Sequence, residues 1–197
     1  MIVATGVCPL RRELLLSACA VGAAMEQAHA RSTGLEHETE EHARLRSDAV
    51  EVDLSDLAPG QLRTLELRGQ KVWVLRRTLD MISTIETLTG SGLLADPMSD
   101  RNAAELTPEY ARNPLRSIKP DIFVAIAICS HGGCLPTARL QAGPNPQRPD
   151  NWRGGFVCPC HFSTWDLAGR VFKDKPALDN LPVPPHVFVG ESRLVLE

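Results

Sequence analysis

The chain reads CSHGGCLP at residues 129–136 and CPCHFSTWD at residues 158–166. Each stretch holds two cysteines and one histidine, and each follows an apolar run that predicts a β-strand, residues 122–128 and residues 156–157. We therefore expect both stretches to form loops at neighbouring strand ends. Thiolate sulfur and imidazole nitrogen are good ligands for transition metals. The two stretches, called box 1 (129–136) and box 2 (158–166) below, predict a metal site.

Three interpretations of the boxes are compatible with the residue types. A structural zinc site would use four of the six cysteines and histidines, but the usual Cys-x₂-Cys spacing occurs in neither box. Two simple disulfides would leave the matched Cys-x-His and Cys-x₂-His pairs unexplained. In a Rieske-type [2Fe–2S] cluster, two thiolates bind one iron and two imidazoles bind the other. The third interpretation is favoured because it assigns every residue, leaving one cysteine in each box to pair with the other.

The favoured interpretation gives four ligands, Cys129 and His131 from box 1 and Cys158 and His161 from box 2. Two neutral imidazoles place less negative charge on the cluster than two thiolates would. They raise its reduction potential to between about −150 and +300 mV. We therefore predict a mild one-electron oxidant.

Hydrogen bonds to the cluster sulfurs would raise the potential further, because they stabilise the reduced and more negative state. Ser163 follows His161 by two residues and is placed to donate one such bond. Backbone N–H groups of the glycine-containing loops, including that of Gly133, are expected to donate others.

Composition and pattern around the boxes predict a mainly β domain. The chain has 197 residues with 15 prolines and 14 glycines, most of them after residue 90, which favours short strands and many loops. One helix is expected at residues 79–88, with Thr78 as its N-cap. Residues 90–120 are expected to be irregular. Further strands are predicted at residues 50–54, 62–67, 71–76, 170–172, 187–189 and 193–196.

The charge pattern excludes one class of partner. The formal net charge is −3, and no block of lysine or arginine suggests nucleic-acid binding.

The N-terminal residues predict an export signal or membrane anchor. Arg11 and Arg12 precede an apolar run at residues 14–25, as in a twin-arginine signal. The run is shorter than the about 20 residues that span a bilayer. Ala-His-Ala at 28–30 has the form of a cleavage site. We expect residues 1–30 to be a helical signal or anchor segment, residues 31–48 a hinge or linker, and residues 49–197 the folded domain.

Residues 49–197 resemble the Rieske iron–sulfur subunit of ubiquinol–cytochrome c reductase, the cytochrome bc complex, in its proteobacterial form. The proline-containing insertion between the boxes is typical of that form. The matching stretches outside the boxes are VDLSDLAPGQLRT (52–64), VWVLRRT (72–78), NPLRS (113–117), WRGGF (152–156), DLAGRVFK (166–173) and NLPVPPH (180–186).

The resemblance implies an antiparallel Rieske-type β-sandwich, with a cluster-binding subdomain at about residues 126–180 inserted between strands. It also implies a disulfide between Cys134 and Cys160 that ties the boxes together, a bond that persists in an oxidising compartment. Rieske oxygenases lack these extra cysteines and need a second, mononuclear iron site. No carboxylate–histidine triad for such a site is evident in this sequence.

The resemblance further implies that the chain passes one electron from ubiquinol, bound at cytochrome b, to cytochrome c₁, coupled to proton release. His131 or His161 would accept the hydrogen bond and the proton of the quinol. The subunit would act on the periplasmic side of the bacterial inner membrane, held by its N-terminal segment, and would not be catalytic alone. The alternatives are a soluble periplasmic Rieske ferredoxin-like carrier without quinol oxidation, and a zinc-binding structural module.

Five features depart from the family pattern. Gly132 stands where a cluster-shielding leucine is usual, and Phe162 stands where glycine is usual, so Phe162 is strained if its φ is positive. Trp165 replaces a tyrosine or phenylalanine, and either its indole N–H donates to a ligand sulfur or that bond is missing. The loop at 175–178 lacks a usual second proline at Leu178, and Glu26 interrupts the anchor. We predict a potential below that of close relatives.

Overall fold

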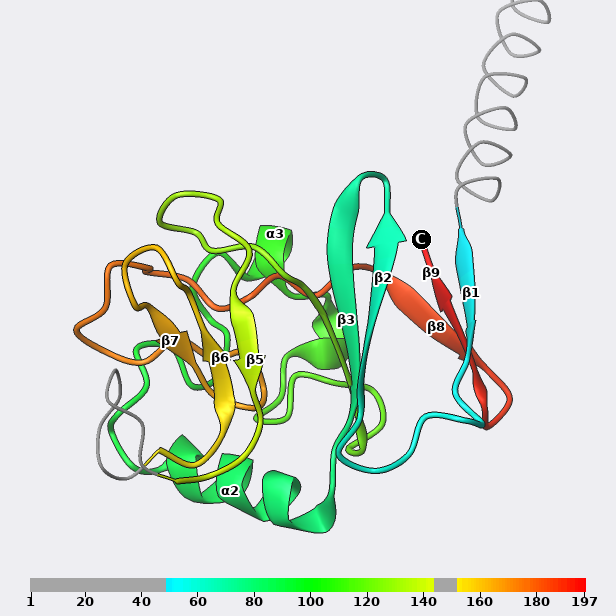
Figure 1. Ribbon diagram of the computed structural model, residues 1–197, viewed down its shortest axis with the longest axis horizontal. Coiled ribbons are helices and arrows are strands. Elements are labelled where there is room, and N and C mark those ends of the chain that lie inside the picture. Colours follow the sequence, from blue (N-terminus) through cyan, green and yellow to red (C-terminus); the bar gives the residue numbers. More distant parts are fainter. Residues whose placement is uncertain (1–48, 144–151) are drawn as a thin grey trace, which may run out of the picture. The chain divides into compact units, whose positions relative to one another are not determined.

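Figure 1 shows the protein as a computed structural model, which describes residues 49–143 and 152–197. The signal or anchor segment predicted at residues 1–30 and the linker predicted at residues 31–48 lie outside the described residues. Within the described part of the chain, no helix combines the length and apolar character needed to cross a bilayer.

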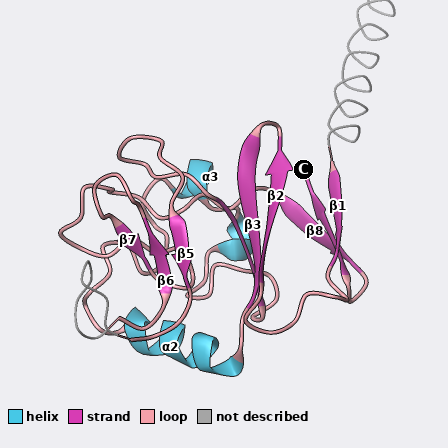
Figure 2. Ribbon diagram, viewed as in Figure 1, coloured by secondary structure: helices cyan, strands magenta, loops and turns pink. Residues whose placement is uncertain are grey.

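Nine strands in the described residues form three antiparallel sheets, so the predicted mainly β fold is confirmed (Figure 2). The sheets have the strand orders β1-β9-β8, β2-β3-β4 and β5-β6-β7. The strands are β1 (Val50–Asp53), β2 (Leu62–Leu67), β3 (Gln70–Arg76), β4 (Ile122–Ile126), β5 (Thr137–Arg139), β6 (Gly155–Val157), β7 (Thr164–Trp165), β8 (His186–Val189) and β9 (Arg193–Leu196). The helices are α2 (Leu79–Thr89), α3 (Ala103–Leu106) and the 3₁₀ turn η1 (Glu109–Ala111).

The β2-β3-β4 sheet lies between the other two sheets, and its strands β3 and β4 are buried on both faces (Figure 1). Alternate side chains of a strand point to opposite faces, so β3 supplies both cores. Val72 and Val74 join the core shared with β1 and β9, whereas Trp73 and Leu75 join the core on the other side. We call the second one the box core. It contains Trp73, Leu75, Ile85, Phe123, Ala125, Ala127, Cys129, Phe156, Cys158, Trp165, Leu167, Ala168, Val171, Ala177 and Leu181.

Cys129 and Cys158 therefore lie in the same core as the central sheet, which fixes the start of each box. Aromatic rings fill much of the space between sheet and boxes. The rings of Trp73 and Phe156 stack with centroids 4.7 Å apart, and Phe123 lies 6.0 Å from Phe156. Such packing leaves few alternative positions for the strand ends from which the boxes emerge.

The helix and the hairpin follow the sequence expectations. Helix α2 begins after Thr78, whose hydroxyl oxygen accepts a hydrogen bond from the Met81 N–H at 3.2 Å. Strands β2 and β3 pair in register from Leu62–Leu75 to Leu67–Gln70, as the hairpin prediction requires.

The prediction of a strand at residues 170–172 is wrong. Two isolated bridges, Trp165 with Val171 and Leu94 with Phe172, take its place. The sequence analysis does not predict strands β5 and β7, because these two or three residues show neither an alternating pattern nor an apolar run. The short helices α3 and η1 lie within the stretch expected to be irregular.

Candidate metal centre

The two boxes adopt the same loop conformation. In box 1, the Cys129 N–H donates to the carbonyl of Cys134 at 3.0 Å, and the Gly133 N–H donates to the carbonyl of Cys129 at 2.8 Å. In box 2, the Cys158 N–H donates to the carbonyl of Ser163 at 2.8 Å, and the Phe162 N–H donates to the carbonyl of Cys158 at 3.0 Å. Each loop is thus closed by hydrogen bonds at the same spacing, starting from its first cysteine.

Gly133 and Phe162 occupy equivalent positions in these loops, and both have positive φ, 71° and 59°. Glycine adopts this left-handed conformation without penalty, whereas a residue with a bulky side chain is strained in it. The strain expected at Phe162 is therefore present. Packing does little to offset it, because the Phe162 side chain remains 45% exposed.

Replacing Phe162 with glycine is expected to stabilise the domain. The left-handed conformation costs a non-glycine residue roughly 1–2 kcal/mol, which glycine would remove. Glycine also makes the unfolded chain more flexible, and this offsets roughly 0.5–1 kcal/mol of the gain in stability. We expect the free energy of unfolding of Phe162→Gly to rise by about 0.5–1 kcal/mol. Denaturant titration measures it, with Gly133→Ala as the matched variant that should lose stability.

The boxes bring together two buried thiols and two exposed imidazoles. Cys129 and Cys158 are free cysteines with 2% and 1% exposure. The rings of His131 and His161 lie edge to face with centroids 4.8 Å apart, and both side chains are exposed. The donor atoms are thus sorted by type, sulfur on the inside and nitrogen at the surface.

The Cys129 thiol lies in a mixed environment. Burial raises its pKa, as does the neighbouring Cys158 thiol, whereas backbone N–H groups of His131 and Gly132 act to lower it. These two N–H groups are directed at the sulfur and would stabilise a thiolate or a metal-bound sulfur. Sequence reasoning missed them, since only the closed loop turns the two amides toward the cysteine.

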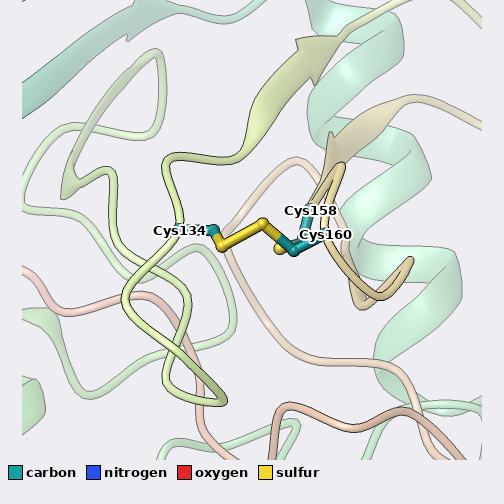
Figure 3. A group of neighbouring side chains, drawn as sticks. All are labelled: Cys134, Cys158 and Cys160. Carbon is teal, nitrogen blue, oxygen red and sulfur yellow. A yellow bond between two sulfur atoms is a disulfide. The ribbon is translucent and has the colours of Figure 1, made fainter.

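A disulfide between Cys134 and Cys160 joins the two boxes, as Figure 3 shows. This is the pairing that the family resemblance implies. The Sγ atoms of Cys134, Cys158 and Cys160 lie within 4.8 Å of one another. Because two of these sulfurs are bonded to each other, only Cys158 in this group is free to bind a metal.

The tuning residues have distinct partners. Ser163 is fully buried, and its hydroxyl oxygen accepts a hydrogen bond from the Ala177 N–H at 2.9 Å, which leaves the hydroxyl hydrogen free to donate. The indole N–H of Trp165 donates to the carbonyl of Asp179 at 2.9 Å. Of the two alternatives for Trp165, the missing bond to a ligand sulfur agrees with this contact. The Gly133 N–H, expected to donate to a cluster sulfur, donates instead to the carbonyl of Cys129 within its own loop.

Comparison with known proteins agrees with this geometry. A model of the Rieske [2Fe-2S] domain matches residues 110–185, which include both boxes. The ubiquinol-cytochrome c reductase iron-sulfur subunit of Allochromatium vinosum is 40% identical over 194 residues, covering 98% of this chain and 91% of the relative. The chain belongs to this family of Rieske iron–sulfur subunits.

More distant relatives include a mitochondrial Rieske subunit of the cytochrome b-c1 complex from Nicotiana tabacum. It is 36% identical over 148 residues, covering 75% of this chain and 48% of the relative. Among solved structures, a chain of a hyperthermophilic respiratory Complex III matches 92% of this Rieske subunit and 98% of its own length, with 20% identity and a TM-score of 0.46.

As a Rieske iron–sulfur subunit, the chain is a component of an oxidoreductase and carries a [2Fe–2S] cofactor, as predicted. The residues described above fit this cofactor. A cluster with one thiolate-bound and one imidazole-bound iron needs two sulfur donors and two nitrogen donors grouped by type. The two buried thiols and the two adjacent imidazoles meet that need.

Proposed function

We propose that Cys129 and Cys158 hold one iron of the cluster and that His131 and His161 hold the other. The support is the pairing itself, because the two thiols are neighbours in the box core and the two imidazoles are neighbours at the surface. The Cys134–Cys160 disulfide keeps the boxes side by side.

The proposed activity is transfer of one electron from ubiquinol, bound at cytochrome b, to cytochrome c₁. The observation that carries this proposal is the exposure of both imidazoles beside each other, while both thiols are buried. When bound, the cluster supplies one-electron redox chemistry at a mild potential. The free ring nitrogen of an iron-bound imidazole, once it has lost its own proton, can accept a hydrogen bond from a quinol hydroxyl and take up that proton, so electron and proton would leave the quinol at one place.

The same proposal includes a location. The names of the relatives refer to a reductase and a cytochrome b-c1 complex. We place this subunit in an equivalent complex at the bacterial inner membrane, with its Rieske domain on the periplasmic side and its N-terminal segment as anchor.

Expression of the full chain with and without its cognate cytochromes b and c₁ tests the proposal. We expect the chain to co-purify with both cytochromes and to restore quinol-dependent, inhibitor-sensitive reduction of cytochrome c. His161→Ala should abolish that activity, whereas Leu79→Ala, at an exposed position on α2, should leave it intact. Recovery of a cluster-loaded protein that binds neither cytochrome would instead indicate a soluble ferredoxin-like carrier.

The reduction potential is expected to lie below that of the Allochromatium vinosum subunit. The Trp165 N–H is engaged by Asp179 instead of a ligand sulfur. A cluster whose sulfurs accept fewer hydrogen bonds is harder to reduce, because its reduced and more negative state is less stabilised. Trp165→Tyr, which supplies the hydroxyl that the family pattern has as a donor at this position, should raise the potential. Potentiometric titration of the subunit, its variant and the relative checks both points, and an equal or higher potential in this subunit would refute the first.

A further inference from the structure

Five charged side chains other than histidine are buried among the described residues. They are three arginines, Arg77, Arg116 and Arg170, and two aspartates, Asp96 and Asp166. None of them belongs to the metal centre. Buried arginines are uncommon without a carboxylate partner for each, so this imbalance needs an explanation.

The three arginines converge on one turn, residues 166–170, which begins at the last residue of box 2. Arg77 donates through Nε to the carbonyl of Leu167 at 3.2 Å. Arg116 donates through Nη1 to the carbonyls of Ala168 and Gly169 at 3.1 and 3.2 Å. We call these three side chains the arginine clamp.

Arg170 lies within the turn and binds Asp166. Its Nε and Nη2 donate to Asp166 Oδ2 at 2.9 and 2.7 Å, in an ion pair with no exposure on either side. The other carboxylate oxygen of Asp166 accepts the N–H groups of Ala168 and Arg170, both at 2.9 Å. Every residue of the turn is thereby held by a guanidinium group or by the Asp166 carboxylate.

The clamp has three guanidinium groups and one carboxylate bonded to them, Asp166, while Asp121 acts electrostatically on Arg77 and Asp96 on Arg116. Within the described chain, Asp166 pairs with Arg170, whereas Arg77 and Arg116 make their hydrogen bonds to carbonyl and hydroxyl oxygens. The Asp96 carboxylate accepts the backbone N–H groups of Asp100 and Arg101.

Burial lowers the pKa of Arg77 to about 9 and that of Arg116 to about 10, while nearby Asp166 acts to raise both. Both values remain above neutral pH. The two guanidinium groups therefore stay charged inside the protein.

The clamp and the proposed ligands share one core. Leu167, Ala168 and Leu181, whose carbonyls the clamp binds, belong to the box core together with Cys129 and Cys158. Salt screens charges poorly in such an interior, and the lower effective dielectric lengthens their reach. A guanidinium group that is hydrogen-bonded to the backbone of this core is therefore poorly screened from a change of charge at the metal centre.

We propose that the arginine clamp is a positioning and electrostatic device that raises the reduction potential of the [2Fe–2S] cluster. The inference rests on the ligand set proposed above. Reduction adds one electron to the cluster and neither forms nor breaks a bond in the clamp. The buried guanidinium groups favour that added negative charge, and they also fix the turn that begins at the last residue of box 2. The clamp would offset part of the loss of potential expected from the missing Trp165 donor.

Two variants with opposite expected shifts in reduction potential distinguish an electrostatic effect from a loss of structure. Arg116→Met removes a cation and should lower the potential, whereas Asp166→Asn removes an anion and should raise it. Each change should alter the reduced-to-oxidised ratio at a fixed ambient potential by roughly three- to tenfold. Arg116→Lys keeps the positive charge, so its reduction potential should stay close to that of the parent protein. The exposed pair of Asp56 and Arg63 supplies the controls Asp56→Asn and Arg63→Met, which should leave the potential unchanged.

The measurement is a potentiometric titration of the full-length, cluster-loaded protein, monitored by electron paramagnetic resonance. Shifts of opposite sign support the clamp, and shifts of the same sign, or none, overturn it. If the Arg116→Met protein is not obtained in folded form, Arg77→Met replaces it, and its reduction potential should shift in the same direction. A parent protein without a Rieske spectrum would refute the proposed function itself, which is a different outcome from a normal parent whose variants do not shift.

Discussion

Replacing Cys158 with serine is expected to remove the visible absorption and the paramagnetic signal of the purified protein. Cys158 is fully buried and free, and it neighbours Cys129 in the box core. Serine oxygen is a poorer donor than thiolate for an iron–sulfur cluster. Changes to residues that merely support a ligand already cost 10–100-fold in metal affinity, so losing a ligand should lower cluster occupancy by more than roughly tenfold. Iron and sulfide analysis measures the occupancy.

The matched control is Cys8→Ser, which removes a thiol outside the 110–185 stretch that matches the Rieske domain. It should retain full occupancy. A Cys158→Ser protein that keeps its iron, its sulfide and its signal would show that another residue binds the metal.

Removing the disulfide with Cys134→Ala and Cys160→Ala together is expected to destabilise the domain by about 3 kcal/mol. The bond links residues 26 positions apart, so its loss frees a loop of that size in the unfolded chain. The boxes would also lose their covalent link, and the cluster should be lost faster in air. Denaturant titration gives the free energy of unfolding, and absorbance decay gives the rate of loss.

A thiol reductant provides the control for the disulfide. It should lower the stability of the parent protein to that of the double variant and leave the double variant unchanged. Equal stability of parent and double variant without reductant would contradict the account.

The sequence sufficed for those features that depend on residue type and spacing. One cysteine and one histidine per box, with one cysteine left over, predict the four proposed ligands and agree with the observed disulfide. The apolar runs at residues 72–75 and 122–128 predict the strands β3 and β4. The positive φ of Phe162 was foreseen from a family pattern that has glycine there.

Other features depend on the three-dimensional path of the chain. The amides of His131 and Gly132 reach the Cys129 sulfur only because hydrogen bonds close the loop. The Trp165 indole finds the Asp179 carbonyl, which lies 14 residues further along the chain. Nothing in their local sequence marks Arg77 or Arg116 as buried, since arginine is usually exposed.

Electron paramagnetic resonance of the chemically reduced protein, prepared with and without ¹⁵N-labelled histidine, tests the central claim most directly. The proposed ligand set predicts a Rieske spectrum in which two histidine nitrogens couple to the cluster, and the labelled protein should change both couplings. A colourless protein that contains zinc, or a reduced cluster that shows no histidine nitrogen coupling, would contradict it.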